Sequence, residues 1–122
     1  MSNAVGWFEI YVDDINRAQD FYEAVFDVKL EKLAGMDMEM LTFPMNPETY
    51  GAPGALVKMP GFPSGGNSVL VYFSCADCGV SAEKAKQAGG EIQKAKMSLG
   101  ENGFMALVTD TEGNMLGLHS MA

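Results

Sequence analysis

The second half of the chain repeats the pattern of the first half, and this duplication limits the folds that the chain can adopt. Each half reads as a strand, a helix and then three further strands. A shift of 63 positions places residues 12–14 on residues 75–77. Few residues are identical between the halves, but the strand phase and the start of the helix coincide. Repetition at a fixed spacing indicates two modules of the same supersecondary structure.

Capping residues and side-chain spacing predict the elements of both modules. Asp13 or Asp14 can cap a first helix, whose apolar side chains recur at helical spacing. Asp77 can cap a second helix, which Gly89 and Gly90 end. Strands are expected at residues 7–12, 28–35, 36–43 and 55–59, and again at 68–75, 91–96, 104–110 and 114–120.

The chain of 122 residues has the length of a single domain. We expect one domain over residues 1–122, with module one at about 5–59, a linker rich in Pro and Gly at about 60–67, and module two at about 68–120. The formal net charge of −8 argues against nucleic acid and against an anionic membrane as partners. Because no membrane span or signal peptide is recognisable, we expect a cytoplasmic protein.

The stretch WFEIYVDD, residues 7–14, places a carboxylate among bulky apolar side chains. Side chains alternate between the two faces of a strand, so Trp7, Glu9 and Tyr11 share one face. This face could simply lie in water, or it could line a cavity. The strands expected at residues 68–75 and 114–120 also have one apolar face and one face that mixes apolar and polar side chains. Tyr72 and His119 lie on these mixed faces. Two abutting sheets of this kind would enclose a largely apolar cleft into which Glu9, Tyr72 and His119 point.

Cys75 and Cys78 form the motif CADC. A structural zinc site normally needs a second pair of ligands, and a redox CxxC places its first Cys at a helix N-terminus. Here Cys75 falls at the end of a strand and Cys78 at the start of the second helix. We therefore interpret the pair as packing residues, with redox or metal function as the less favoured alternative.

Two motifs make the chain similar to a known family. The pattern D-x-x-R-A-x-x-F-Y begins at Asp14, and D-x-E-G-N begins at Asp110. Together with the tandem modules, they resemble the vicinal oxygen chelate superfamily of glyoxalases, bleomycin-resistance proteins and dioxygenases. The resemblance covers about residues 5–120 and implies an α+β fold, in which tandem βαβββ modules form a curved mixed sheet around a concave cleft. Asp27 departs from the pattern, since similar sequences usually carry Gly there.

The metal chemistry of that family does not transfer to these residues. The resemblance places three of the four usual ligand positions on Trp7, Leu70 and Gly117, whose side chains cannot bind a metal. No ligand stands out in the strand at 55–59 for the fourth position. We therefore expect no metal at this position and no cofactor.

Two functions remain open for the cleft, which we expect to bind a small, largely apolar molecule. The first is a metal-independent enzyme, of lyase or isomerase type, that uses Glu9 and His119 as an acid/base pair with Tyr72 beside them. The second is sequestration of the molecule without catalysis, as in bleomycin-resistance proteins, and a third alternative is a module that serves assembly only. The expected ligand-binding residues are Trp7, Tyr11, Phe43, Tyr50, Leu70, Ser74, Met115 and Gly117. By resemblance we also expect a homodimer, with neither nucleic acid nor membrane as a partner.

Overall fold

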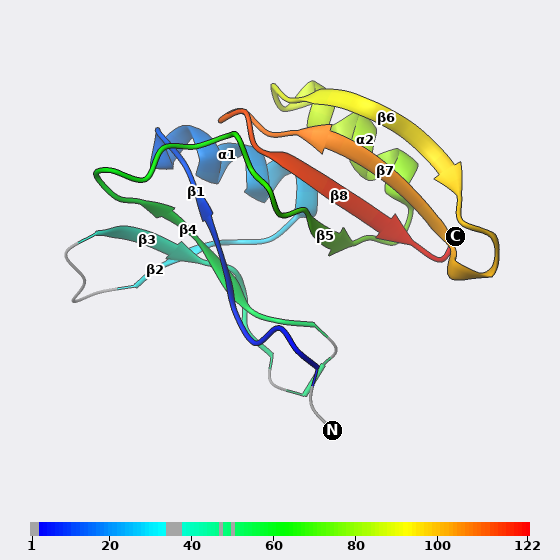
Figure 1. The fold of residues 1–122 in the computed structure, drawn as a ribbon, viewed down its shortest axis with the longest axis horizontal. Coiled ribbons are helices and arrows are strands. Elements are labelled where there is room, and N and C mark those ends of the chain that lie inside the picture. The colour runs from blue at the N-terminus through cyan, green and yellow to red at the C-terminus, as the bar shows by residue number, and fades with distance from the viewer. Residues whose placement is uncertain (1–2, 34–37, 47, 50) are drawn as a thin grey trace.

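The computed structural model describes residues 3–33, 38–46, 48–49 and 51–122. In these residues each module forms a four-stranded sheet and one α-helix (Figure 1). In both sheets the first strand of the module pairs in parallel with the last strand, and the other pairs are antiparallel. The predicted α+β fold of tandem βαβββ modules is therefore confirmed, with two mixed sheets in place of one continuous sheet.

The first sheet has the strand order β1-β4-β3-β2. Its module consists of β1 (Phe8–Tyr11), α1 (Ile15–Phe26), β2 (Glu31–Lys32), β3 (Glu39–Thr42) and β4 (Gly54–Lys58). Asp14 caps α1, because its side chain accepts hydrogen bonds from the backbone N–H groups of Asn16 and Arg17. At the other end of α1, Asp27 has a φ of 51° and lies in the left-handed region.

The second sheet has the strand order β5-β8-β7-β6. Its module consists of β5 (Val71–Ser74), α2 (Cys78–Gln87), β6 (Glu91–Ser98), a 3₁₀ turn (Gly100–Asn102), β7 (Phe104–Thr109) and β8 (Met115–Ser120). Asp77 caps α2 by accepting a hydrogen bond from the N–H of Gly79. Neither helix in the described part of the chain has the length and apolar character needed to cross a membrane.

An aromatic cluster packs the two modules together on the helix side of the sheets. The ring of Phe73, on β5, stacks on Phe26 of α1 with ring centroids 4.3 Å apart. Tyr22 contacts both Phe43 and Phe73, and Phe8 closes the cluster from β1. Because these rings come from both modules, their burial fixes how α1 sits against β5.

Residues of the motifs D-x-x-R-A-x-x-F-Y and D-x-E-G-N form hydrogen bonds that join the two modules. Arg17 at the start of α1 donates two hydrogen bonds to the carboxylate of Glu112, with Nε 2.6 Å from Oε2. The buried hydroxyl of Tyr22 donates to Asp110 Oδ2 at 2.7 Å, and Asn114 Nδ2 donates to the carbonyl oxygen of Tyr11. These bonds join residues about 90 to 100 positions apart in the chain. The residues that carry the family resemblance therefore hold the modules in place.

Candidate functional site

Glu9 is an exposed carboxylate that two aromatic side chains of its own strand hold in place. The hydroxyl of Tyr11 donates to Glu9 Oε1 at 2.8 Å, and the indole N–H of Trp7 donates to Oε2 at 3.2 Å. The hydrogen bond to Glu9 raises the pKa of Tyr11. Phe62, from the linker, stacks on Tyr11 with ring centroids 5.2 Å apart. The carboxylate in this strand is thus the acceptor for the polar atoms of its aromatic neighbours.

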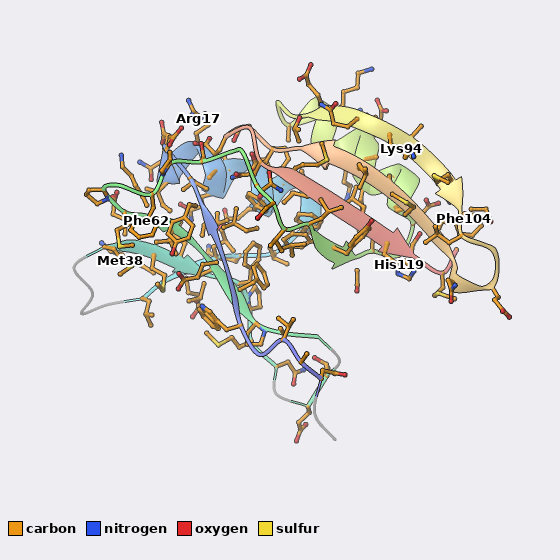
Figure 2. All side chains as sticks on the ribbon, in the orientation of Figure 1. Arg17, Met38, Phe62, Lys94, Phe104 and His119 are labelled. Atoms are coloured by element: carbon orange, nitrogen blue, oxygen red, sulfur yellow. The ribbon has the colours of Figure 1, made fainter. Side chains whose placement is uncertain are left out.

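His119 lies near the end of β8, where its ring nitrogen Nε2 is 2.7 Å from the carbonyl oxygen of Asn102 (Figure 2). A carbonyl oxygen only accepts hydrogen bonds, so Nε2 carries the proton. In the neutral ring Nδ1 then keeps its lone pair. The sheet register places Ser74 of β5 and Met105 of β7 opposite His119 on either side.

Glu9 and His119 line different hollows of the structure. Glu9 lines a hollow of about 500 Å³ along β1, together with Met115 (the linker hollow). His119 lines a hollow of about 930 Å³ on the second sheet, together with Tyr72 and Ser74 (the sheet hollow). Glu9 and His119 also belong to different sheets. Among the described strands β1 pairs only with β4 and β5 pairs only with β8, so no strand pairing joins the two sheets at these edges. Glu9 and His119 therefore line different hollows, and the acid/base pair stays a prediction, whereas Tyr72, Ser74 and His119 do share a hollow.

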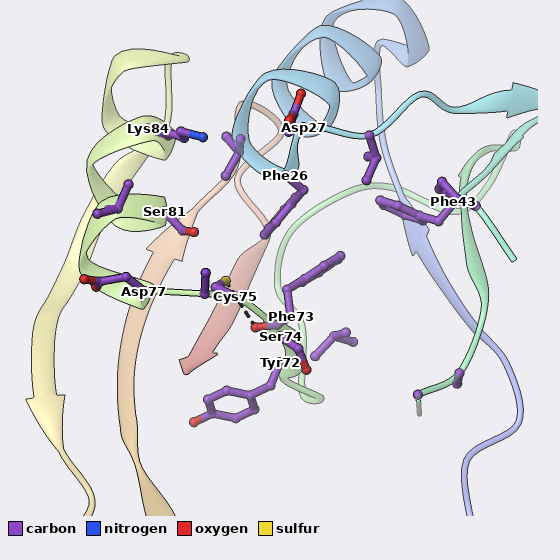
Figure 3. Close-up of a pocket in the computed structure, with 18 of the residues that line it drawn as sticks. Phe26, Asp27, Phe43, Tyr72, Phe73, Ser74, Cys75, Asp77, Ser81 and Lys84 are labelled. Atoms are coloured by element: carbon purple, nitrogen blue, oxygen red, sulfur yellow. Dashed lines mark hydrogen bonds between the residues drawn. The ribbon is translucent and has the colours of Figure 1, made fainter. Parts of the chain in front are cut away.

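A third hollow, of about 650 Å³, lies between the end of α1, the start of α2 and β5 (Figure 3). We call it the seam hollow. Phe26, Phe43 and Phe73 contribute apolar surface to it, and Ser81 and Lys84 of α2 add polar groups. Asp27 at the end of α1 is a further polar group in the lining, so the hollow is a largely apolar cavity with a few polar groups, which is the usual character of a small-molecule site.

The seam hollow and the sheet hollow are neighbours. Both are lined by Gly51, Ala52, Tyr72, Ser74 and Cys75. Since Tyr72 and Ser74 belong to β5, the two hollows lie on either side of the free edge of this strand. Tyr72 and Ser74 are both exposed and stand at the junction.

The other predicted binding residues are spread over the molecule. Phe43 is 9% exposed and belongs to the aromatic cluster, so the seam hollow meets it at the edge of the core. Gly117 is buried under the ring of Tyr72, and a β-carbon at position 117 would clash with that ring. Leu70 precedes β5 and lines none of the three hollows. Trp7 is 40% exposed beside Glu9, and Tyr50 lies outside the described residues.

The two cysteines have different surroundings. Cys78 is fully buried at the first position of α2, and its backbone N–H donates to Ser120 Oγ. Cys75 lines both the seam hollow and the sheet hollow, and partial burial raises the pKa of its thiol. A raised pKa disfavours the reactive thiolate, which agrees with the interpretation of the pair as packing residues.

The residues on which the family resemblance places the metal ligands do not fit a divalent ion. Trp7 uses its indole N–H for Glu9, and Gly117 is covered by Tyr72. Within the described ranges no three His, Cys, Asp or Glu side chains gather closely enough to hold a metal ion. We therefore assign no step of any reaction to a metal at this position.

Comparisons with known proteins agree with this fold. The model of the Glyoxalase/Bleomycin resistance protein/Dioxygenase superfamily matches residues 4–118, and the chain belongs to this family. A family enzyme from Burkholderia phytofirmans PsJN is similar in structure, with a TM-score of 0.74, 15% identity and coverage of 96% of this chain and 98% of that one. A hypothetical protein from S. aureus gives a TM-score of 0.70, 16% identity and 98% coverage of both chains.

Glyoxalase I from Zea mays is also similar, with a TM-score of 0.72 and 21% identity, and the match covers 94% of this chain but 45% of that enzyme. The comparison with curated proteins found no match. At these identities the likeness to solved structures shows the fold alone.

Sequence reasoning missed several residues that line the sheet hollow. Met105, Leu99 and Met121 lie around His119, and residues 3–5 approach from the N-terminal side. Met105 could have been found, because strict alternation in the strand at 104–110 places it on the face opposite Ala106 and Val108. Leu99 and Met121 lie outside the strands, where alternation gives no signal.

Proposed function

We propose that this family member binds a small, largely apolar molecule around the free edge of β5, in the seam hollow and the sheet hollow. The observation that carries this proposal is the contact between the two hollows at Tyr72, Ser74 and Cys75. Their volumes, about 650 and about 930 Å³, lie in the range of cavities that hold drug-sized ligands.

The side chains around the two hollows favour a ligand with an aromatic or aliphatic body and few polar groups. Phe26 and Phe73 offer aromatic surface on one side of β5, and Met105 offers a pliable thioether on the other. Ser74 supplies a hydroxyl at the junction, and Lys84 brings a positive charge to the seam hollow, whose lining also contains Asp27 and Asp77. Binding would expel water from these apolar walls, which is the main source of affinity.

We propose sequestration and not acid/base catalysis as the role of this binding. Catalysis by Glu9 and His119 would require both groups within reach of one substrate. In this structure they line separate hollows, and each is hydrogen-bonded to its own neighbours. Sequestration of a molecule needs only a cavity of matching shape and polarity.

A neutral fluorescent naphthylamine, N-phenyl-1-naphthylamine, tests the proposal. Its emission should rise on binding to the wild-type chain, and the variant Ser74→Phe should raise the dissociation constant at least tenfold by filling the junction. The matched control is Ser98→Phe, which places the same side chain at an exposed position of β6 outside both hollows. If Ser98→Phe weakens binding as much as Ser74→Phe, or if the probe does not bind, the site assignment is wrong.

A further inference from the structure

The sheet hollow has an apolar wall and no Asp, Glu, Lys or Arg among the described residues that line it. Leu99, Met105 and Met121 supply apolar surface, and the polar groups include the hydroxyl of Ser74 and the imidazole of His119. An ionic group that entered this hollow would give up water without meeting a side chain of opposite charge, which is costly. The lining therefore favours an uncharged ligand.

The hydrogen bond of His119 fixes the direction in which its free acceptor points. Nε2–H donates to the carbonyl oxygen of Asn102, which ends the 3₁₀ turn before β7. The two ring nitrogens of an imidazole point in nearly opposite directions, so the lone pair of Nδ1 points away from this turn. In the sheet β8 lies between β7 and β5, and His119 lies between the turn and β5 in Figure 2. Nδ1 therefore points towards the β5 side.

Nδ1 of His119 is also open to solvent. In the described part of the chain every buried side-chain nitrogen or oxygen has a hydrogen-bond partner, whereas the hydrogen bond of this half-buried ring involves Nε2 only. Of the three hollows named above, His119 lines the sheet hollow alone. Nδ1 is therefore an accessible hydrogen-bond acceptor in that hollow.

Ser74 of β5 is the neighbour of His119 on the side to which Nδ1 points. The register pairs the two residues, and neighbouring strands lie about 4.8 Å apart. The preceding pair with the same phase, Tyr72 and Gly117, shows that these side chains share a face, because the ring of Tyr72 covers Gly117. One hydroxyl oxygen between the two residues could accept a hydrogen bond from Ser74 Oγ–H and donate one to Nδ1, at about 2.7–2.8 Å each.

We propose that the sheet hollow selects an uncharged ligand that carries a hydroxyl group, with His119 Nδ1 as the acceptor and Ser74 as the donor for that hydroxyl. An ether or a ketone offers no proton to Nδ1, and an aromatic N–H offers no lone pair to Ser74. A ligand without the hydroxyl would leave Nδ1 desolvated and unpaired, which costs affinity. This inference rests on the proposed small-molecule function and adds the polar group by which the ligand is recognised.

Isothermal titration of the full chain with 2-naphthol and with 2-methoxynaphthalene tests the proposal, because the methyl ether keeps the apolar body and removes only the donor. We expect 2-naphthol to bind at least fivefold more tightly. A cavity without a matching acceptor would favour the ether, which is the more apolar of the two. 2-Naphthoate, which carries a charge in place of the hydroxyl, should bind at least tenfold more weakly than 2-naphthol.

Two variants assign the two hydrogen bonds. His119→Phe keeps a ring and removes the acceptor, so the preference for 2-naphthol over its ether should fall below twofold. Ser74→Ala should weaken 2-naphthol at least threefold. The matched control is Ser68→Ala, at an exposed position outside the sheet hollow, which should leave the dissociation constant within twofold of the wild-type value. Far-UV circular dichroism verifies that each variant is folded.

A second measurement needs no variant, because His119 is the only histidine of the chain. With ¹⁵N-labelled histidine, at an alkaline pH that keeps the imidazole neutral, saturating 2-naphthol should shift the Nδ1 resonance and 2-methoxynaphthalene should shift it much less. Equal shifts, equal affinities of 2-naphthol and its ether or of 2-naphthol and 2-naphthoate, a preference that survives His119→Phe, or equal effects of Ser74→Ala and Ser68→Ala would overturn this inference and leave the proposed function standing. If none of the three compounds binds, both are wrong.

Discussion

Glu112 accepts several of the hydrogen bonds that join the two modules. Its side chain is fully buried and accepts hydrogen bonds from Arg17, Thr111 and the backbone N–H groups of Asp13 and Asp14. Burial opposes ionisation, but these donors outweigh it and hold the pKa of Glu112 at about 2, against an ordinary value of 4.5. A difference of this size corresponds to about 3 kcal/mol of folding free energy at neutral pH.

We predict that acid weakens the fold through Glu112. Because the pKa is lower in the folded state, this contribution is fully present above about pH 4.5 and is lost as the pH falls towards 2. Glu112→Gln should lower the free energy of unfolding at pH 7 by about 2–3 kcal/mol, and it should flatten the acid limb between pH 4.5 and 2. Urea titrations over this pH range measure both effects. Glu83→Gln, at an exposed position of α2, is the matched control and should change neither.

Gly117 gives a second prediction at the residue scale. The ring of Tyr72 covers this glycine, so Gly117→Ala forces the ring away from β8. We expect a loss of about 1 kcal/mol of stability in the wild-type background. In the Tyr72→Ala background the same substitution should cost much less, because the clashing ring is gone. Equal losses in both backgrounds, measured as a double-mutant cycle, would show that the ring does not rest on Gly117.

Of the two α-helices, α1 has the less favourable backbone conformation at its C-terminal end. Asp27 follows the helix with a φ of 51° and a ψ of 49°, a conformation that costs energy for residues with a β-carbon. We predict that Asp27→Gly raises the free energy of unfolding by up to about 1 kcal/mol, seen as a higher urea midpoint. Asp27→Ala should lower it, because alanine keeps the strain without the local hydrogen bonding that aspartate offers. A lower midpoint for Asp27→Gly would mean that the aspartate makes a stabilising contact that outweighs its strain.

The sequence predicted the elements well where the signal is local. Asp14 and Asp77 cap the helices as expected, since a cap depends only on neighbouring backbone groups. Of the strand expected at residues 28–35, the described part 28–33 forms only Glu31–Lys32, at the sheet edge, where both residues are exposed and packing adds little. Residues 34 and 35 lie outside the described part of the chain. The sequence left open which face of residues 36–43 lines the cleft. In the structure Leu41 packs on the helix-side core, and Met40 lies on the other face.

The candidate site was predictable only within one sheet. Tyr72, Ser74 and His119 come together because β5 and β8 are neighbours, and alternation along each strand fixes their face. Glu9 belongs to the other sheet, and its distance from His119 depends on how the modules dock. That docking is set by long-range contacts such as Tyr22 with Asp110, which no local pattern in the sequence contains.

On the scale of the whole molecule, we predict that two copies associate through the exposed face of β1. Trp7 and Phe62 are 40% and 49% exposed on this face, and Phe62 stacks on Tyr11 beside them. Exposed aromatic side chains that gather in this way are typical of association surfaces. Each copy carries a net charge of −8, so the copies repel one another and the apolar contact must exceed that repulsion. Added salt screens the repulsion and should therefore strengthen association.

Sedimentation velocity at micromolar concentration tests this association. We expect the wild-type chain to sediment as a species of twice 13.1 kDa, with a dissociation constant that falls as the salt concentration rises. Phe62→Asp should shift the equilibrium to the monomer, because it places a charge in the apolar contact. Val80→Asp is the matched control, since Val80 is 55% exposed but lies on α2, away from β1. A wild-type chain that stays at 13.1 kDa would refute the dimer, and equal dissociation by both variants would show that the contact lies elsewhere.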